Sequence, residues 1–219
     1  PPGGVLQIFS IEAHPITADE AARALGRWPE LAGIAAPLIA RWPGRAPGRH
    51  RVDFPEIGAI LDLAVMDAAD ALAGWNGRAD AWFLDGFSPA LNPQMWTDGI
   101  LALVAARSAP GARAATFTVA GQVRRGLAAA RFAVEKRPGF GRKRERLEAR
   151  FPGDPDTPTS PRVAIVGAGV AGAAAARAVR ALGGETLLIE AAHPGAGGSG
   201  NPSALVTPRL DAGLGEASR

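Results

Sequence analysis

The stretch from Arg162 to Glu190 constrains the fold more than any other part of the 219-residue chain. An apolar run (RVAIVG) leads into three glycines, Gly167, Gly169 and Gly172, which open an alanine-rich segment that ends near Leu182. A second apolar run (TLLIE) follows and ends in an acidic residue 18 positions beyond the last glycine. Strand, glycine turn, helix and strand in this order predict a βαβ unit.

Each glycine of this unit has a physical reason. Gly167 permits a tight turn, Gly169 lets the backbone approach a pyrophosphate, and Gly172 lets the helix pack closely on the strand. Glu190 can accept hydrogen bonds from ribose hydroxyls. The glycine spacing alone is a weak signal, because glycine and alanine are abundant in this chain. The ordered context favours a dinucleotide-binding unit over a plain βαβ unit.

Strands and helices also alternate in the first 151 residues. The segments with the apolar or alternating pattern of a strand are 5–12, 49–67, 79–85, 112–118, 132–137 and 144–151. Helices are predicted after Thr17, which forms a capping-box pattern with Glu20, and over 121–130. This alternation predicts an α/β fold with a mostly parallel sheet.

A proline-rich stretch, Pro152 to Pro161 (PGDPDTPTSP), separates the two halves. Prolines among small polar residues do not build a helix or an inner strand, so this stretch predicts an extended linker. We therefore expect a first domain over 1–151, a linker over 152–161 and a second domain that starts at 162 and continues to 219.

Three of the expected strands in the first domain end in a carboxylate, at Glu12, Asp67 and Asp85. In a parallel sheet, ligands bind outside the carboxyl ends of the strands. Any one of these acids is more simply explained as the cap of the next helix. Three acids at successive strand ends favour a ligand site.

Composition narrows the chemistry. The chain has no cysteine and three scattered histidines, so we expect no metal, and catalysis must come from carboxylates or a bound cofactor. It has no long apolar window and no signal-peptide pattern, so we expect no membrane contact and a cytoplasmic location. Its positive charge is mostly arginine, which permits a nucleic-acid partner but is also explained by genomic composition.

Several long strings resemble known proteins. The segment HPGAGGSGN after Glu190 resembles the FAD-binding turn of the glycine and D-amino-acid oxidase group. Together with LVTPRLD further on, the strings AWFLDGFSPALNPQMW and EKRPGFGRKRE are similar to the family of bifunctional tRNA-modifying enzymes that complete the 5-methylaminomethyl group of wobble uridine. This resemblance runs through both halves and the linker.

The resemblance implies a truncated Rossmann-like methyltransferase sheet followed by the first βαβ unit of an FAD-binding Rossmann-type domain. It also implies two small molecules, FAD as cofactor and S-adenosyl-L-methionine as co-substrate. The family's glycine-rich S-adenosylmethionine loop and most of its flavin domain are not in the sequence. We therefore expect an incomplete fragment.

In the methyltransferase half, the resemblance places Glu12 on the ribose of S-adenosylmethionine and Asp67 near its adenine amino group. Asp85 is the expected catalytic residue, because a carboxylate can hold the acceptor amine in line with the methyl group and take up its proton. Phe87 would form a wall of the substrate pocket. Trp96 would either lie beside it or pack in the core.

In the flavin half, the residues that the resemblance assigns to the ADP end of FAD are Gly167, Gly169, Gly172, Glu190, Ser199 and Gly200. Arg209 would approach flavin or substrate, or form a surface salt bridge. The basic run 137–150 would contact the tRNA backbone through Arg142, Lys143 and Arg144. Its alternative is a solvated charged strand.

The implied function is a two-step modification of wobble uridine in the tRNA anticodon stem-loop. FAD-dependent oxidation would remove the carboxymethyl group of 5-carboxymethylaminomethyl(-2-thio)uridine, and S-adenosylmethionine would then methylate the 5-aminomethyl nitrogen. Two other functions stay open. One is a stand-alone FAD-dependent amine oxidase, and the other is a non-catalytic tRNA-binding relative.

Overall fold

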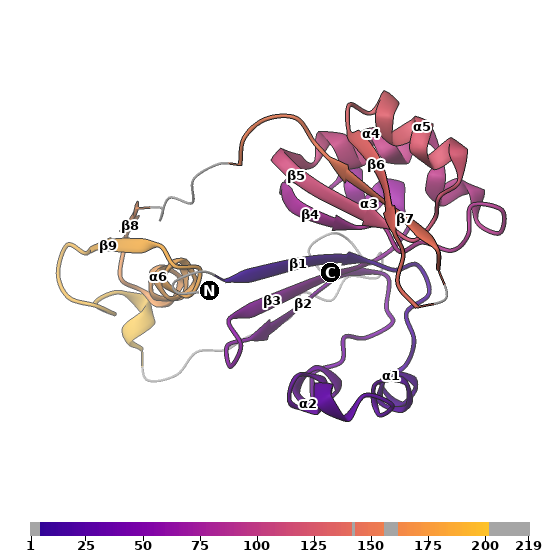
Figure 1. Cartoon of the computed structure of the whole chain (residues 1–219). Coiled ribbons are helices and arrows are strands. Elements are labelled where there is room, and N and C mark those ends of the chain that lie inside the picture. Colours follow the sequence, from indigo (N-terminus) through magenta and orange to yellow (C-terminus); the bar gives the residue numbers. More distant parts are fainter. Residues whose placement is uncertain (1–4, 142, 156–161, 202–219) are drawn as a thin grey trace, which may run out of the picture. The chain divides into compact units, whose positions relative to one another are not determined.

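The computed structural model describes residues 5–141, 143–155 and 162–201 of an α/β protein (Figure 1). The chain divides into two compact units. The larger one spans Leu6–Pro158, and the smaller one contains the elements that follow Thr159. Each unit is described by itself.

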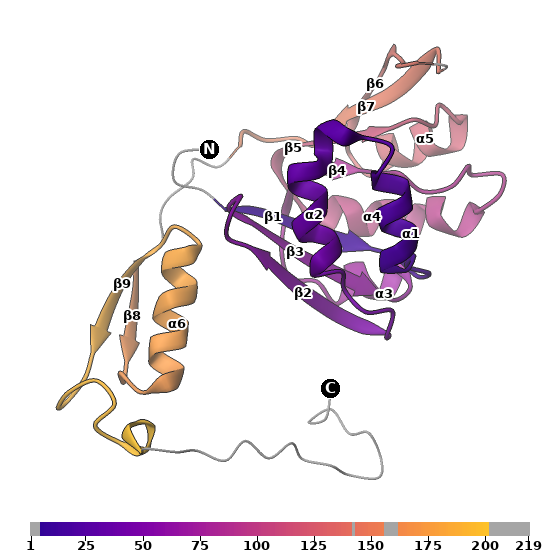
Figure 2. The same cartoon turned by 90° about the horizontal axis from the view of Figure 1, so that it is seen from below.

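The larger unit contains two sheets. The first has the strand order β1-β3-β2, and its strands are β1 (Leu6–Ile11), β2 (Gly48–Phe54) and β3 (Ala59–Val65). The second has the order β4-β5-β7-β6, and its strands are β4 (Ala79–Phe83), β5 (Ser108–Thr116), β6 (Ala133–Pro138) and β7 (Glu145–Arg150). Helices α1 (Ala18–Leu25) and α2 (Ala32–Ala40) connect β1 to β2 and pack against each other (Figure 2).

The capping box predicted at the start of the first helix is confirmed. The Glu20 N–H donates to the Thr17 hydroxyl at 3.3 Å, and the Thr17 N–H donates to the Glu20 carboxylate at 2.8 Å. These two bonds satisfy donors that the first helical turn leaves free. The Thr17 N–H bond to the Glu20 carboxylate, together with a bond from the Thr17 hydroxyl to the same carboxylate at 2.9 Å, lowers the pKa of Glu20.

The segment 49–67, expected to follow one strand pattern, is an antiparallel hairpin. β2 ends at Phe54 and β3 begins at Ala59. Between them Gly58 has φ 62°, a left-handed conformation that glycine adopts readily. Val52, Phe54 and Ala59 are buried together. Because apolar residues lie on both sides of the turn, the hydrophobic pattern does not mark it.

The sheets are not mostly parallel, and this prediction was wrong. β1 pairs with β3 and β4 with β5 in parallel, whereas the β2–β3, β5–β7 and β6–β7 pairs are antiparallel. The connections β2–β3 and β6–β7 are short turns, and a short turn permits only antiparallel pairing. β5 also begins earlier than predicted, at Ser108, because Pro110 and Gly111 interrupt the strand pattern without ending the strand.

Three helices cover one face of the second sheet. They are α3 (Ala68–Ala73), α4 (Asp98–Ala106) and α5 (Gly121–Ala129). Leu101, Val123, Leu127 and Leu147 are the largest fully buried side chains, and they join α4, α5 and β7 in one cluster. Burial of each contributes about 1.5–3 kcal/mol of hydrophobic free energy.

Trp75, in the loop between α3 and β4, links the two sheets of the larger unit. Its ring stacks on Phe9 of β1 with a centroid distance of 4.5 Å, and it meets Trp82 of β4 edge-on at 6.1 Å. Arg107 adds a link between helices, because its guanidinium donates to the carbonyl oxygens of Leu72 and Ala73 at the end of α3.

The smaller unit confirms the predicted βαβ arrangement. β8 (Arg162–Val166) and β9 (Glu185–Ile189) pair in parallel, and α6 (Val170–Ala181) connects them. A short 3-10 helix, η3 (Gly198–Gly200), follows β9.

Candidate functional site

The glycine turn, Gly167 to Gly172, follows β8 and includes the first turn of α6, which begins at Val170. Gly167 has φ 99°, which side chains other than glycine rarely adopt. A Cβ on Gly172 would lie 1.8 Å from the Gly167 carbonyl oxygen, and a Cβ on Gly169 would lie 2.8 Å from the Ser199 Oγ. The backbone geometry therefore requires glycine at 167 and 172, whereas at 169 the close contact is with the Ser199 side chain.

The segment after β9 packs against this turn. The Val170 N–H, in the first turn of α6, donates to the Ser199 Oγ at 3.0 Å. The Gly195 N–H donates to the Ala168 carbonyl oxygen at 3.0 Å. A Cβ on Gly200 would lie 2.2 Å from the Gly195 carbonyl oxygen, so this position also requires glycine.

Glu190 ties the end of β9 to the glycine turn. One of its carboxylate oxygens accepts from the Ala168 N–H at 2.7 Å, and the other accepts from the N–H groups of Ala191 and Ala192 at 2.8 and 3.3 Å. Hydrogen bonds to an ionised carboxylate stabilise that form. The bond from Ala168, followed by those from Ala192 and Ala191, therefore lowers the pKa of Glu190.

In the larger unit, Glu12 and Asp67 follow parallel strands and lie at the same end of the first sheet, where Ile11 of β1 pairs with Ala64 of β3. Asp67 is the N-cap of α3, and its Oδ1 accepts from the Ala69 N–H at 2.7 Å. This is the helix-capping role that the sequence left open. The Glu12 side chain is exposed, and its Oε1 accepts from the His14 N–H at 2.8 Å.

Asp85 follows β4, and its side chain is exposed. Among the described residues, no hydrogen bond or ion pair engages the Asp85 carboxylate. The Leu84 N–H donates to the Ala115 carbonyl oxygen at 2.9 Å, so the backbone just before Asp85 is held by β5. The carboxylate is therefore available to a cationic or hydrogen-bonding ligand.

Trp96 supports the turn that follows Asp85. Its Nε1–H donates to the Phe87 carbonyl oxygen at 2.8 Å, and its ring is part of the main hydrophobic cluster. A Cβ on Gly86 would lie 3.3 Å from this ring. Trp96 is thus a core residue that also positions the turn, whereas the Phe87 side chain is 76% exposed. The hydrogen bond gives Trp96 a positioning role that sequence reasoning missed.

The same loop contains a second residue that sequence reasoning missed. The Oδ1 of Asn92 is buried, and it has no hydrogen-bond partner among the described residues. A buried acceptor without a donor is uncommon and costs free energy. An asparagine between leucine and proline carries no sequence signal for such a position.

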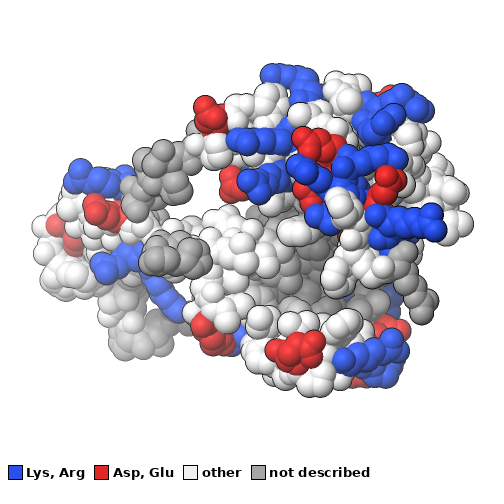
Figure 3. All heavy atoms as spheres, viewed as in Figure 1, with Lys and Arg blue, Asp and Glu red and all other residues white. Residues whose placement is uncertain are grey.

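The basic run 137–150 is partly neutralised by acidic neighbours. In the hairpin of β6 and β7, Lys136 pairs with Glu145 at 3.0 Å and Arg137 with Glu135 at 2.7 Å, while Arg146 pairs with Glu148. Figure 3 shows blue and red side chains interspersed over this part. Lys143 and Arg144 have no ion pair with any described residue. Arg142, predicted with them, lies outside the described residues, as does Arg209 of the flavin half.

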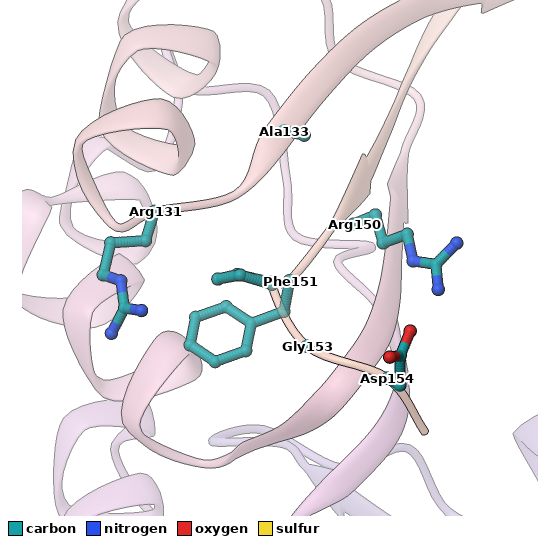
Figure 4. Close-up of a pocket in the computed structure, with 7 residues that line it drawn as sticks. Arg131, Ala133, Arg150, Phe151, Gly153 and Asp154 are labelled. Carbon is teal, nitrogen blue, oxygen red and sulfur yellow. The ribbon is translucent and has the colours of Figure 1, made fainter.

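A hollow of about 550 Å³ lies at the base of this hairpin, and the residues lining it are Arg131, Ala133, Arg150, Phe151, Pro152, Gly153 and Asp154. Figure 4 shows Arg131 on one side and Arg150 with Asp154 on the other, with the Phe151 ring between them. No predicted site residue lines this hollow. It is separate from the candidate sites above.

Residues 5–141, 143–155 and 162–201 contain neither a metal-ligand cluster nor a helix suited to span a membrane. No three histidine or acidic side chains come together there as ligands for a metal ion. None of the helices in these ranges combines the length and the apolar character that a bilayer crossing needs.

Known protein families match both halves of the chain. The S-adenosyl-L-methionine-dependent methyltransferase family matches residues 29–152. The FAD dependent oxidoreductase family matches residues 162–218. The first match covers more than half of the chain, and the second includes the glycine turn.

Single proteins match nearly the whole chain. The tRNA 5-methylaminomethyl-2-thiouridine biosynthesis bifunctional protein MnmC of Caulobacter vibrioides is 66% identical over 216 residues, which cover 98% of this chain and 36% of that protein. The protein of the same name from Maricaulis maris is 46% identical over 219 residues, covering 96% of this chain and 37% of that protein. This chain therefore spans about a third of the length of these relatives.

Among solved structures, the crystal structure of MNMC2 from Aquifex aeolicus matches with a TM-score of 0.55 and 24% sequence identity. The match covers 71% of this chain and 47% of that one, and it supports the fold alone. With the family matches, these similarities show that the chain belongs to the S-adenosyl-L-methionine-dependent methyltransferase family, continues into an FAD dependent oxidoreductase domain, and resembles the bifunctional MnmC proteins throughout.

Proposed function

We propose that this chain is part of a cytoplasmic enzyme that modifies the wobble uridine of tRNA in two steps. An FAD-dependent oxidation removes the carboxymethyl group of 5-carboxymethylaminomethyl(-2-thio)uridine, and the freed 5-aminomethyl nitrogen is then methylated from S-adenosylmethionine. The observation that carries this proposal is the 66% identity to a bifunctional tRNA-modifying protein over 98% of the chain. Methylation is assigned to 1–151 and oxidation to 162–219, with a linker over 152–161.

Three strand-end carboxylates of the larger unit fit the methylation step. The exposed Glu12 carboxylate has lone pairs for the ribose hydroxyls of S-adenosylmethionine, beyond the one engaged by His14. Asp67 has one oxygen bonded to Ala69 and a second oxygen for the adenine amino group. We assign the methyl-transfer reaction to Asp85, whose carboxylate has no hydrogen-bond or ion-pair partner among the described residues.

The role of Asp85 follows from the charge of the acceptor. A primary amine is mostly protonated at neutral pH, and an ammonium has no lone pair with which to attack the methyl carbon. The Asp85 carboxylate attracts this ammonium, orients it and accepts a proton from it. The nitrogen lone pair then forms the new N–C bond while the C–S bond breaks and leaves a neutral thioether. The product nitrogen loses its remaining extra proton to solvent.

The smaller unit fits the ADP end of FAD. Gly167 and Gly169 carry no side chain that could block a pyrophosphate, and α6 begins directly after Gly169. Glu190 is held ionised at the end of β9, where it can accept from the ribose hydroxyls. Ser199 and Gly200 belong to η3, which is held next to the turn by the bond from the Val170 N–H to the Ser199 Oγ. FAD, when bound, supplies hydride acceptance for oxidation of the carbon beside the amine nitrogen.

The test uses purified protein, tRNA that carries 5-aminomethyluridine, and methyl-labelled S-adenosylmethionine. Label transfer to the wobble nucleoside is expected, and Asp85→Asn should abolish it while calorimetry shows nearly unchanged S-adenosylmethionine binding. Asp80→Asn is the matched control, because Asp80 is an exposed aspartate within β4. Near-normal turnover of Asp85→Asn would contradict its catalytic role.

The same protein is tested for oxidation of tRNA that carries the carboxymethylaminomethyl group. Oxidation of free amines without methyl transfer to tRNA would support a stand-alone amine oxidase instead. Binding of tRNA without either reaction would support a non-catalytic relative.

A further inference from the structure

The hairpin of β6 and β7 extends beyond the second sheet as an arm. The pairing of β5 with β7 ends at Thr116 and Leu147, whereas the pairing of β6 with β7 continues to Pro138 and Glu145. Figure 2 shows this arm projecting past the other strands of the sheet. At about 3.3 Å per residue, Arg144 lies roughly 10 Å beyond the last residue that β7 pairs with β5.

The arm projects from the end of the sheet at which β4 and β5 have their carboxyl ends, and the candidate catalytic residue lies at that end too. Thr116 is the carboxyl end of β5, so the arm continues past that end. β4 is parallel to β5, with Phe83 opposite Ala115, and Asp85 therefore follows β4 at this same end of the sheet. A substrate whose amine reaches Asp85 would lie on the side from which the arm projects.

Two backbone hydrogen bonds connect described residues at the tip of the arm. The Gly139 N–H donates to the Arg144 carbonyl oxygen at 2.9 Å, and the Lys143 N–H donates to the Phe140 carbonyl oxygen at 3.2 Å. A Cβ on Gly139 would lie 2.1 Å from the Lys143 carbonyl oxygen, and Gly141 has φ 60°. This closed turn leaves Phe140 84% exposed.

The charges near the tip differ from those along the arm. Within the strands Lys136, Arg137 and Arg146 are paired with glutamates and Arg150 lies at the base of the arm, whereas at the tip Lys143 and Arg144 have no such partner among the described residues. An exposed aromatic ring next to unpaired cations suits single-stranded nucleic acid, because an unpaired base stacks on the ring while the cations contact neighbouring phosphates. A base-paired stem hides its base faces and offers the ring nothing comparable.

We propose that Phe140 stacks on an unpaired base of the RNA substrate, with Lys143 and Arg144 on the adjacent phosphates. The arm thereby favours a single-stranded loop over a paired stem and holds that loop beside Asp85. This inference depends on the proposed function, which names tRNA as the substrate.

The test measures binding of an unmodified tRNA transcript to the full chain at several salt concentrations. Phe140→Ala should weaken binding by about 5- to 150-fold, whereas Phe140→Trp should retain it. The salt dependence should not change in Phe140→Ala, because no charge is removed. The double variant Lys143→Gln and Arg144→Gln should flatten the salt dependence instead.

Two controls separate stacking from a structural effect. A blunt RNA duplex should bind wild type and Phe140→Ala equally, and both proteins should melt at the same temperature. Trp28→Ala removes another exposed aromatic ring, which is 56% exposed, and should leave tRNA binding unchanged.

The outcomes are distinct. If wild type binds tRNA and Phe140→Ala binds it equally well, or loses tRNA and duplex to the same extent, the stacking role is wrong while the proposed function stands. If wild type binds no tRNA, the proposed function fails and the stacking role fails with it.

Discussion

Replacing Gly172 by alanine tests the packing on which the glycine turn depends. The new Cβ would lie 1.8 Å from the Gly167 carbonyl oxygen, and real Cβ atoms essentially never come within 3.0 Å of such an atom. α6 must therefore move away from the turn by roughly 1.2 Å. Overpacking of this kind costs about 1–3 kcal/mol, even though the substitution adds a single methyl group.

Hydrogen exchange of the α6 amides measures this cost locally. A loss of about 1–3 kcal/mol should accelerate exchange through local opening by about 5- to 150-fold. Gly197→Ala is the matched control, since a Cβ at Gly197 meets no atom within 4 Å. The flavin absorbance that remains after gel filtration is a second measurement, and it should fall in Gly172→Ala only.

The reasoning fails if Gly172→Ala exchanges its α6 amides and retains flavin as wild type does. That result would mean that the turn and α6 relax without cost. The close approach would then not explain the glycine. Loss of flavin with unchanged hydrogen exchange would indicate that Gly172 is needed for flavin binding and not for the packing of α6 on the turn.

Two further predictions concern single hydrogen-bonding groups. Trp96→Phe keeps an aromatic ring in the core but loses the donor to Phe87, so the free energy of unfolding should fall by about 1 kcal/mol in urea titrations, and methyl transfer should slow at unchanged S-adenosylmethionine affinity. The lowered pKa of Glu190 stabilises the folded smaller unit above the ordinary glutamate range, and this stabilisation is lost as the pH falls through the lowered pKa. Hydrogen exchange of the glycine turn should follow that loss in wild type and lack it in Glu190→Gln.

The features that the sequence predicts correctly depend on near neighbours in the chain. The capping box joins Thr17 to Glu20, three residues away, and the βαβ unit is marked by glycines that its own backbone requires. The direction of strand pairing depends on turns. The turn between Phe54 and Ala59 contains both Pro55 and Gly58, but 49–67 was interpreted as one strand pattern, so the hairpin was not predicted.

The charge of the basic run depends on contacts across strands, which a sequence pattern does not contain. Lys136 and Glu145 are nine residues apart, yet β6 and β7 bring them to 3.0 Å. Such pairs neutralise Lys136, Arg137 and Arg146 within the strands and leave Lys143 and Arg144 at the tip without a described partner. The tRNA-contact interpretation named Arg142, Lys143 and Arg144, but neither it nor the solvated-strand interpretation predicted the pairing within the strands.

The three carboxylates at strand ends have similar sequence contexts but different hydrogen bonding. Backbone N–H groups bond to Asp67 and Glu12, so part of their capacity to accept hydrogen bonds is already used within the chain. No described group bonds to Asp85. Methyl transfer to an ammonium requires a carboxylate with free lone pairs, so Asp85 suits that step and the other two suit binding of the co-substrate. Local backbone conformation sets this difference in hydrogen bonding, which the strand-end pattern does not contain, so the separate roles expected for the three acids came from the family resemblance and not from that pattern.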